Sequence, residues 1–369
     1  MKIGILTQPL RYNYGGLLQN FALQTILTRL GHDVITLDGE VKTRKTGKYY
    51  LFKLLKKTFS LFLDSKSRFL HIWKYEFTSD ALSRNTRRFI EKHIKVKRIG
   101  HPNESEYDAL IVGSDQVWRP MYSNLEEAFL SFAKKWKSVK RIAYAASFGS
   151  DEWEYSEEET QYCKKLIQLF DVVSVREKSG VKLCKDYLGV NAIHVIDPTL
   201  LLSKEDYVKI LKLDSIEKSD GNLFYYFLDS TNLKLNIVKR VEKELDLKAF
   251  TVNSNVEDSY APLNKRIQPP VEKWLRAFVD ASFVVTDSFH GCVFSIIFNK
   301  RFWVIGNKKR GMTRFISLLA LFGLENRLVD ENDIDNVDYN EPIDWDSVNL
   351  KWSIERTKSQ SVLLEALHK

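Results

Sequence analysis

The stretch that most constrains the fold is a short apolar run that ends in polar residues, with a second apolar run directly after it. The first run ends at Val285, the polar residues lie within 286–291, and the second run spans 293–298. This pattern is typical of a strand–turn–helix unit in an open α/β sheet, where side chains and free helix N-terminal amides gather beyond the strand. A His beside a Gly at such a turn suits anion binding or proton transfer. For this unit alone, a capping Asp or Ser beside a structural His is the better interpretation.

Strand-like apolar runs and helical segments alternate along both halves of the chain, which predicts an α/β fold with two Rossmann-like domains. The predicted strands are 2–7, 33–37, 108–112, 141–145, 172–175, 192–196, 223–228, 248–252, 283–285 and 302–305. The predicted helices are 17–30, 157–169, 178–187, 204–211, 233–245, 271–280, 292–299, 313–322 and 345–368. We expect a first domain over 1–213 with a basic insertion at about 42–100, a second domain over 214–344, and a C-terminal helix over 345–369.

Five segments, in this order, carry a resemblance to a known family. They are Asn13–Gly16 (NYGG), Gly113–Trp118 (GSDQVW), Ser174–Glu177 (SVRE), Asp197–Leu201 (DPTLL) and Asp287–Gly291 (DSFHG). Each segment alone is a weak signal, but the ordered set resembles the polysaccharide pyruvyl transferases from near residue 3 to about residue 330.

The resemblance implies a fold and a reaction. The fold is that of the two-domain GT-B glycosyltransferases, in which the C-terminal helix returns to the first domain. Enzymes of this family transfer the enolpyruvyl carbons of phosphoenolpyruvate (PEP) to sugar hydroxyls, often closing a cyclic ketal and releasing phosphate. PEP is then the donor substrate, no cofactor is expected, and the acceptor is a glycan, expected to be a polyprenyl-linked precursor of a capsule or exopolysaccharide.

One position departs from the family pattern. Many relatives have Arg where this chain has Ser288, and the resemblance implies that this Arg helps to hold PEP. The basic residues Lys308, Lys309, Arg310 and Arg314 follow the next strand and are candidates to supply the missing charge.

Three residues are candidates for the chemistry, because PEP needs cationic groups and its methylene carbon needs a proton. Arg176 follows a strand, and its guanidinium suits a carboxylate or phosphate, whereas the alternative is a salt bridge to Glu177 or another acid. His290 is a candidate proton donor or phosphate ligand. Asp115 is a candidate base toward the acceptor hydroxyl, and a loop-stabilising role fits it equally well.

The remaining candidates divide into two groups. Those expected at the donor are Ser288, Phe289, Gly291, Lys308, Arg310 and Arg314. Those expected at the acceptor are Asn13, Tyr14, Gly15, Gly16, Gln116 and Trp118. The glycine-rich turn at 13–16 lacks the spacing of a dinucleotide or Walker-type motif, so close ligand approach and a simple tight turn both explain it.

Composition limits the possible classes of protein and cellular compartment. The chain has 369 residues, 44% of them hydrophobic, which is enough for two globular domains. The cysteines at 163, 184 and 292 have no disulfide or metal-ligand spacing, which indicates a reducing compartment and no metal site. Residues 3–6 are too few for a signal-peptide core, so we expect a cytoplasmic protein.

The net charge of +8 is unevenly distributed, because the segment 42–98 has 17 Lys and Arg against four acidic residues. Within it, 49–69 alternates basic and apolar positions at helical spacing, as in a helix that lies on an anionic membrane surface. A surface helix packed on its own domain explains the pattern equally well. Co-sedimentation with anionic vesicles, with and without 49–69, distinguishes the two. Nucleic acid is not an expected partner, since no recognition motif is present.

Two other functions compete with pyruvyl transfer. A nucleotide-sugar glycosyltransferase would share the two-domain architecture and would need a base- and ribose-binding site in the second domain. A non-catalytic glycan- or membrane-binding family member would explain the missing Arg at Ser288.

Overall fold

The computed structural model describes residues 1–39, 81–98, 100, 102–211, 213–256, 258, 260–306, 311–330 and 338–368. The basic segment 49–69 lies outside the described residues, and so do Lys308, Lys309 and Arg310. The predictions made for them stay predictions. Within the described ranges, no helix combines the length and the apolar character needed to cross a bilayer.

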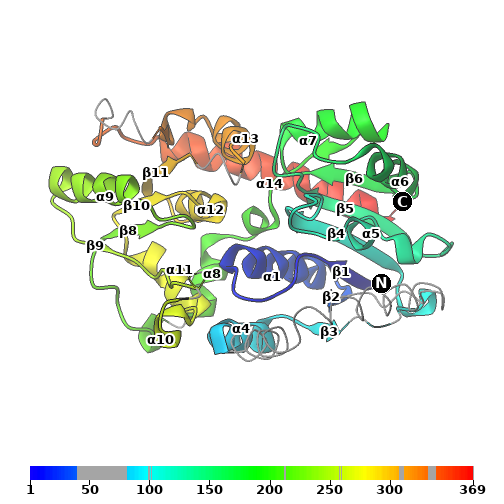
Figure 1. Ribbon diagram of the computed structural model, residues 1–369, viewed down its shortest axis with the longest axis horizontal. Helices are drawn as coiled ribbons and strands as arrows, with labels where there is room; N and C mark the ends of the chain where they lie inside the picture. The colour runs from blue at the N-terminus through cyan, green and yellow to red at the C-terminus, as the bar shows by residue number, and fades with distance from the viewer. Residues whose placement is uncertain are drawn as a thin grey trace, which may run out of the picture.

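The first half of the chain forms a parallel sheet, which has seven strands in the described residues, in the order β3-β2-β1-β4-β5-β6-β7 (Figure 1). The strands are β1 (Lys2–Leu6), β2 (Asp33–Asp38), β3 (Val96–Arg98), β4 (Ala109–Asp115), β5 (Lys140–Ala146), β6 (Val172–Val175) and β7 (Ile193–His194). Ile3 pairs with Val34 on one side and Ala109 on the other, which places β1 inside the sheet. Strands β4 and β5 are almost entirely buried, as expected for a parallel sheet covered on both faces.

A second parallel sheet has the order β12-β11-β10-β8-β9 in the described residues. Its strands are β8 (Leu223–Tyr226), β9 (Ala249–Phe250), β10 (Phe283–Thr286), β11 (Arg301–Ile305) and β12 (Leu328–Val329). Val284 pairs with Phe224 and with Phe302, so β10 is the central strand, and its fully buried side chains explain its apolar sequence. The two sheets confirm the predicted α/β fold with two Rossmann-like halves.

Helices cover the sheets and connect the strands (Figure 1). They are α1 (Tyr14–Arg29), α4 (Arg84–His93), α5 (Leu125–Ala128), α6 (Glu157–Ile167), α7 (Lys178–Leu183), α8 (Lys204–Leu211), α9 (Asn232–Leu245), α10 (Leu263–Arg266), α11 (Val271–Asp280), α12 (Phe289–Ile297), α13 (Thr313–Phe322) and α14 (Trp345–His368). The helix predicted over 178–187 is α7 followed by a π-helical turn, Cys184–Leu188. Helices α4, α5 and α10 and strands β3 and β12 are absent from the predicted elements; α5, α10, β3 and β12 have only two to four residues, too few to show a hydrophobic period.

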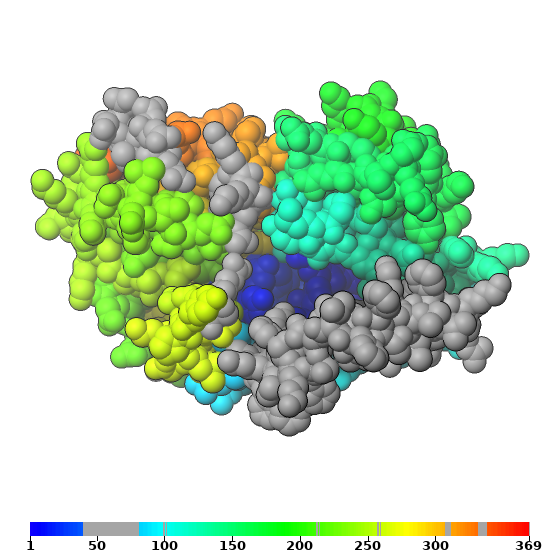
Figure 2. Space-filling view, in the orientation of Figure 1, coloured from blue at the N-terminus to red at the C-terminus, as the bar shows by residue number. Residues whose placement is uncertain are grey.

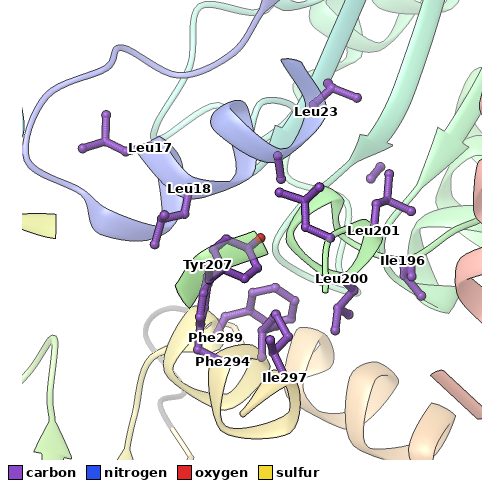
Figure 3. Packing of buried hydrophobic residues seen from close by; sticks show 14 of the residues in the cluster. Leu17, Leu18, Leu23, Ile196, Leu200, Leu201, Tyr207, Phe289, Phe294 and Ile297 are labelled. Carbon is purple, nitrogen blue, oxygen red and sulfur yellow. The ribbon is translucent and has the colours of Figure 1, made fainter. Parts of the chain in front are cut away.

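The two halves share one hydrophobic core around α1, α8 and α12. Figure 3 shows Leu18 of α1 beside Tyr207 of α8, with Phe294 of α12 packed below. The rings of Tyr207 and Phe294 are 4.8 Å apart, edge to face. This shared core holds the N-terminal ends of α1 and α12 close together.

The C-terminal helix α14 contacts both halves of the chain. It lies beside α13 and beside β5, and in Figure 1 it runs from one sheet toward the other. The Trp352 indole donates to the Leu200 carbonyl at 2.7 Å, and the Ile196 amide donates to Ser359 Oγ at 3.1 Å. The helix therefore fixes the loop after β7, which carries Asp197.

Candidate active site

The candidate site lies where the carboxyl ends of β4, β6 and β10 converge between the two sheets. Asp115 is the last residue of β4, Arg176 follows β6, and His290 follows β10 at the start of α12. Figure 2 shows a hollow between the two lobes on this side of the molecule. Ligands in open α/β sheets bind at such strand ends.

Arg176 is held in a cage of three carboxylates. Its Nη1 lies 2.7 Å from Asp197, its Nη2 lies 3.4 Å from Asp115, and its Nε lies 3.4 Å from Glu177, while the side chain is only 2% exposed. Burial acts to lower the pKa of Arg176, but the carboxylates outweigh it and hold the pKa above its usual value. The salt-bridge alternative is therefore what the structure shows, because three carboxylates occupy the guanidinium.

Asp197 is the centre of this network. Its Oδ2 accepts hydrogen bonds from Arg176 and from Ser114 Oγ, and its Oδ1 accepts from the backbone and the hydroxyl of Thr199. Burial acts to raise the pKa of this carboxyl, but His290, Arg176 and Thr199 outweigh it and keep the pKa far below its usual range. Asp197 is thus a fixed negative charge beneath His290.

His290 is buried with an unused nitrogen. Its Nε2 is 3.8 Å from Asp197 Oδ2, too long for a hydrogen bond, and it makes no hydrogen bond to any described residue. The other face of the ring lies against Gly15 at the start of α1, where a Cβ would be 1.9 Å from Nδ1. An imidazole fixed between two helix N-termini and a carboxylate is positioned to bind or protonate a ligand.

Two guanidiniums approach the Phe289 ring, since Arg176 is 4.3 Å and Arg314 is 5.6 Å from its ring centre. Arg314 comes from α13 of the second half of the chain, so the two cations approach from different lobes. Burial and the like charge of Arg176 lower the pKa of Arg314 to about 10, although nearby carboxylates and Tyr122 act in the opposite direction. An anion bound beside Arg314 would stabilise this otherwise disfavoured cation.

The backbone near Asp115 is strained. Asp115 has a φ of 71° and Ala145 on the next strand has a φ of 54°, which are left-handed conformations that non-glycine residues rarely adopt. Strained backbone of this kind concentrates at functional sites, where the surrounding structure maintains it. Here it places the Asp115 carboxylate against Arg176.

Two residues predicted at the acceptor are in the core, and that prediction is corrected. Trp118 is 0% exposed and stacks on Phe129 at 5.0 Å, because its indole fills the space under β4. Tyr14 is 1% exposed and donates to the Pro269 carbonyl at 2.8 Å, next to Trp274. Neither ring has a surface for a sugar.

The other predicted residues mainly shape the backbone around the site. Asn13 accepts from the Gly16 amide and caps α1, as Ser288 accepts from the Gly291 amide and caps α12. Gly291 packs on the Thr286 hydroxyl, where a Cβ would be 2.3 Å away.

Gln116 is nearly buried, and its Oε1 accepts from Arg119 at 3.3 Å. The loops singled out in the sequence thus lie close together in the structure, and Asp197, which was not among the candidates, contacts Arg176 and lies beside His290.

The fold and the site define a two-domain α/β protein of the GT-B type. HepE from Anabaena, solved in complex with UDP, has a TM-score of 0.52 with 11% identity, and the match covers 100% of both chains. A TarM mutant from S. aureus, in complex with Fondaparinux, alpha-GlcNAc-glycerol and UDP, has a TM-score of 0.52 with 10% identity, again over 100% of both chains. At such identities the likeness is one of fold alone.

The family follows from the sequence match. The model of the polysaccharide pyruvyl transferase family matches residues 13–309, which include all five motifs given above. This chain belongs to the polysaccharide pyruvyl transferase family. No protein of curated function matches it.

Proposed function

We propose that the protein is a PEP-dependent pyruvyl transferase that forms a pyruvate ketal on a polysaccharide precursor and releases phosphate. The observation that carries the proposal is the buried His290, whose Nε2 has no hydrogen bond to any described residue and whose ring lies against Phe289, the ring that two guanidiniums approach. The family membership supports a transferase of this class. The acceptor we propose is a lipid-linked glycan at the inner face of the cytoplasmic membrane, to which the basic segment 42–98 is suited.

Arg314 is the proposed anchor for the PEP anion. Among the described groups, three carboxylates face two guanidiniums, so PEP needs further positive charge. We assign that charge to Lys308 and Arg310, which precede α13 in the sequence. In this proposal the turn at Ser288 does not itself supply a positive charge. Ser288 instead caps the helix that carries His290.

The proposed reaction begins when His290 gives its proton to the PEP methylene carbon, which becomes the methyl group of the product. The adjacent carbon becomes electron-deficient, and a first sugar hydroxyl attacks it and loses its proton to a carboxylate, for which Asp115 is the candidate. A second hydroxyl displaces phosphate from the same carbon and closes the ketal. Of the two hydroxyl protons, one is returned to His290 and the other leaves with the displaced phosphate as hydrogen phosphate.

PEP binding is expected to depend on Arg314. PEP should stabilise the wild-type protein in a thermal shift titration. Arg314→Met should lose most of that stabilisation, because the guanidinium proposed to bind the PEP anion is removed. Arg301→Met is the matched control, since Arg301 lies over Phe283 in the same domain and outside the site. Stabilisation by UDP and not by PEP would contradict the proposal and favour a nucleotide-sugar glycosyltransferase.

Gly15 is expected to be required for the position of His290. In Gly15→Ala the new Cβ would lie 1.9 Å from His290 Nδ1, so the ring must move. We expect a loss of turnover on the order of 100-fold, as measured by phosphate release from PEP with an acceptor. Gly16→Ala is the control, because its nearest neighbour is the Asn13 side chain at an ordinary 3.6 Å. Equal turnover in the two variants would exclude this role.

A further inference from the structure

An exposed aromatic ring stands on the loop that follows β4. Tyr122 is 38% exposed, whereas Trp118 on the same loop is fully buried. Hydrogen bonds from the amides of Tyr122 and Ser123 to the Arg119 carbonyl, at 3.0 and 3.1 Å, close the chain into a tight turn. The Ser123 hydroxyl also donates to the Gln116 carbonyl at 3.3 Å. The backbone under Tyr122 is therefore fixed.

The side chain of Tyr122 is supported from below. The Arg119 guanidinium lies 5.4 Å from the ring centre. Arg119 is itself held by Glu154, at 2.8 Å from Nη2 and 3.0 Å from Nε, and by Gln116 Oε1, and its side chain is only 8% exposed. A buried and fully oriented cation thus holds one face of an aromatic ring while the ring remains partly open to solvent.

This ring also lies near the contact between the two lobes, because Arg119, which supports it, donates to Gln116 Oε1. The two lobes also meet nearby, because a Cβ on Gly311 would be 1.8 Å from the Gly149 carbonyl, and a Cβ on Gly149 would be 2.0 Å from Gln116 Oε1. The loop of Tyr122 therefore lies close to the contact between the two lobes.

We propose that the exposed face of Tyr122 is the stacking platform for the acceptor sugar. This inference rests on the proposed function and assigns its acceptor subsite. The ligand class is an uncharged pyranose with one face of C–H groups, since such a face packs on an aromatic ring without leaving a polar group unpaired. Stacked there, the sugar would present its hydroxyls toward Arg314 and the PEP that we place beside it. The platform takes the role that the sequence had suggested for Trp118.

The test measures sugar binding without turnover. Saturation-transfer NMR is recorded with methyl glycosides of galactose, glucose, mannose and N-acetylmannosamine on the wild type and three variants. We expect at least one glycoside to bind the wild type and Tyr122→Phe alike, and Tyr122→Leu to bind about tenfold more weakly. Met121→Ala is the matched control, since Met121 is the more exposed neighbour at 70%.

Two outcomes would overturn the proposal: no binding of any glycoside to the wild type, or unchanged binding in Tyr122→Leu. The PEP thermal shift is measured on the same variants. If PEP still stabilises Tyr122→Leu, the donor site is intact, and a negative result for sugar binding then concerns the Tyr122 platform alone.

Discussion

Arg176→Met is expected to lower the free energy of unfolding by about 3–5 kcal/mol, because it leaves buried carboxylates without their counter-ion. Asp197, Glu177 and Asp115 all contact this guanidinium, and the side chains of Asp197 and Glu177 are at most 2% exposed. Removal of a buried partner costs more than the pair contributes, since the remaining charges keep their desolvation penalty. Chemical denaturation at neutral pH measures the loss.

The loss of unfolding free energy in Arg176→Met is expected to become smaller in acid, and Asp197 explains the direction of this change. Its folded pKa is depressed, so its stabilising contribution is present above the pKa of the unfolded chain and is lost as pH falls through the lower folded value. Arg176→Met removes part of that depression, since His290 and Thr199 also contribute to it. The difference between variant and wild type should therefore narrow as the pH falls below about 4, the ordinary carboxyl range.

Arg29→Met is the control for this prediction. Arg29 pairs with Asp206 at 2.6 Å, but its side chain is 51% exposed. An ion pair at the surface contributes about 0–1 kcal/mol, so the control should be nearly as stable as the wild type. An Arg176→Met protein as stable as the Arg29 variant would show that the carboxylate cage is not a folding determinant.

This prediction changes how an inactive Arg176 variant is interpreted. Loss of activity would follow from the collapse of the network under His290, without any contact between Arg176 and PEP. Arg314 differs, because burial and Arg176 disfavour its charge, and its pKa falls to about 10. Both guanidiniums approach Phe289, but the pKa of Arg176 is raised by its carboxylates and that of Arg314 is lowered. We therefore expect a bound anion to stabilise the charge of Arg314 more than that of Arg176.

The fold could be predicted from the sequence because the strands are apolar and buried on both faces. Runs such as 109–112 and 283–285 have no other stable location than a covered parallel sheet. The same reasoning found the loops of the site, since polar residues directly after such strands must lie at their carboxyl ends. It could not predict β3 or β12, because these strands have only three and two residues and form through pairing with the neighbouring strand.

The contacts within the site could not be predicted in this way. Asp197 and Arg176 are 21 residues apart, and nothing in their spacing shows that they share a hydrogen bond. Trp118 and Tyr122 are both aromatic residues after β4, but the first fills the core and the second faces solvent. Which ring is buried depends on the packing of Phe129 and Phe148 against the indole, and these residues lie farther along the chain.

His290→Gln is expected to reduce turnover by about 10²–10⁴-fold while the protein stays folded, because an amide cannot transfer the proton. The imidazole Nε2 has no hydrogen bond to a described residue, so the substitution removes none there. Asp197 keeps its hydrogen bonds to Arg176, Ser114 and Thr199, so the substitution leaves no buried charge without a partner. Turnover is followed in D₂O by phosphate release and by deuterium in the pyruvyl methyl group, which reports the protonation step directly.

His93→Gln is the matched control for this substitution. His93 is also an imidazole whose Nε2 has no hydrogen-bond partner among the described residues, but it packs on Phe89 of α4, outside the site. It should release phosphate and incorporate deuterium at the wild-type rate. If His290→Gln still incorporated solvent deuterium at that rate, another group would be the acid. PEP binding that was lost in His290→Gln would then identify the imidazole as a phosphate ligand, because a residue that acts only as the acid is not required for the ground-state complex.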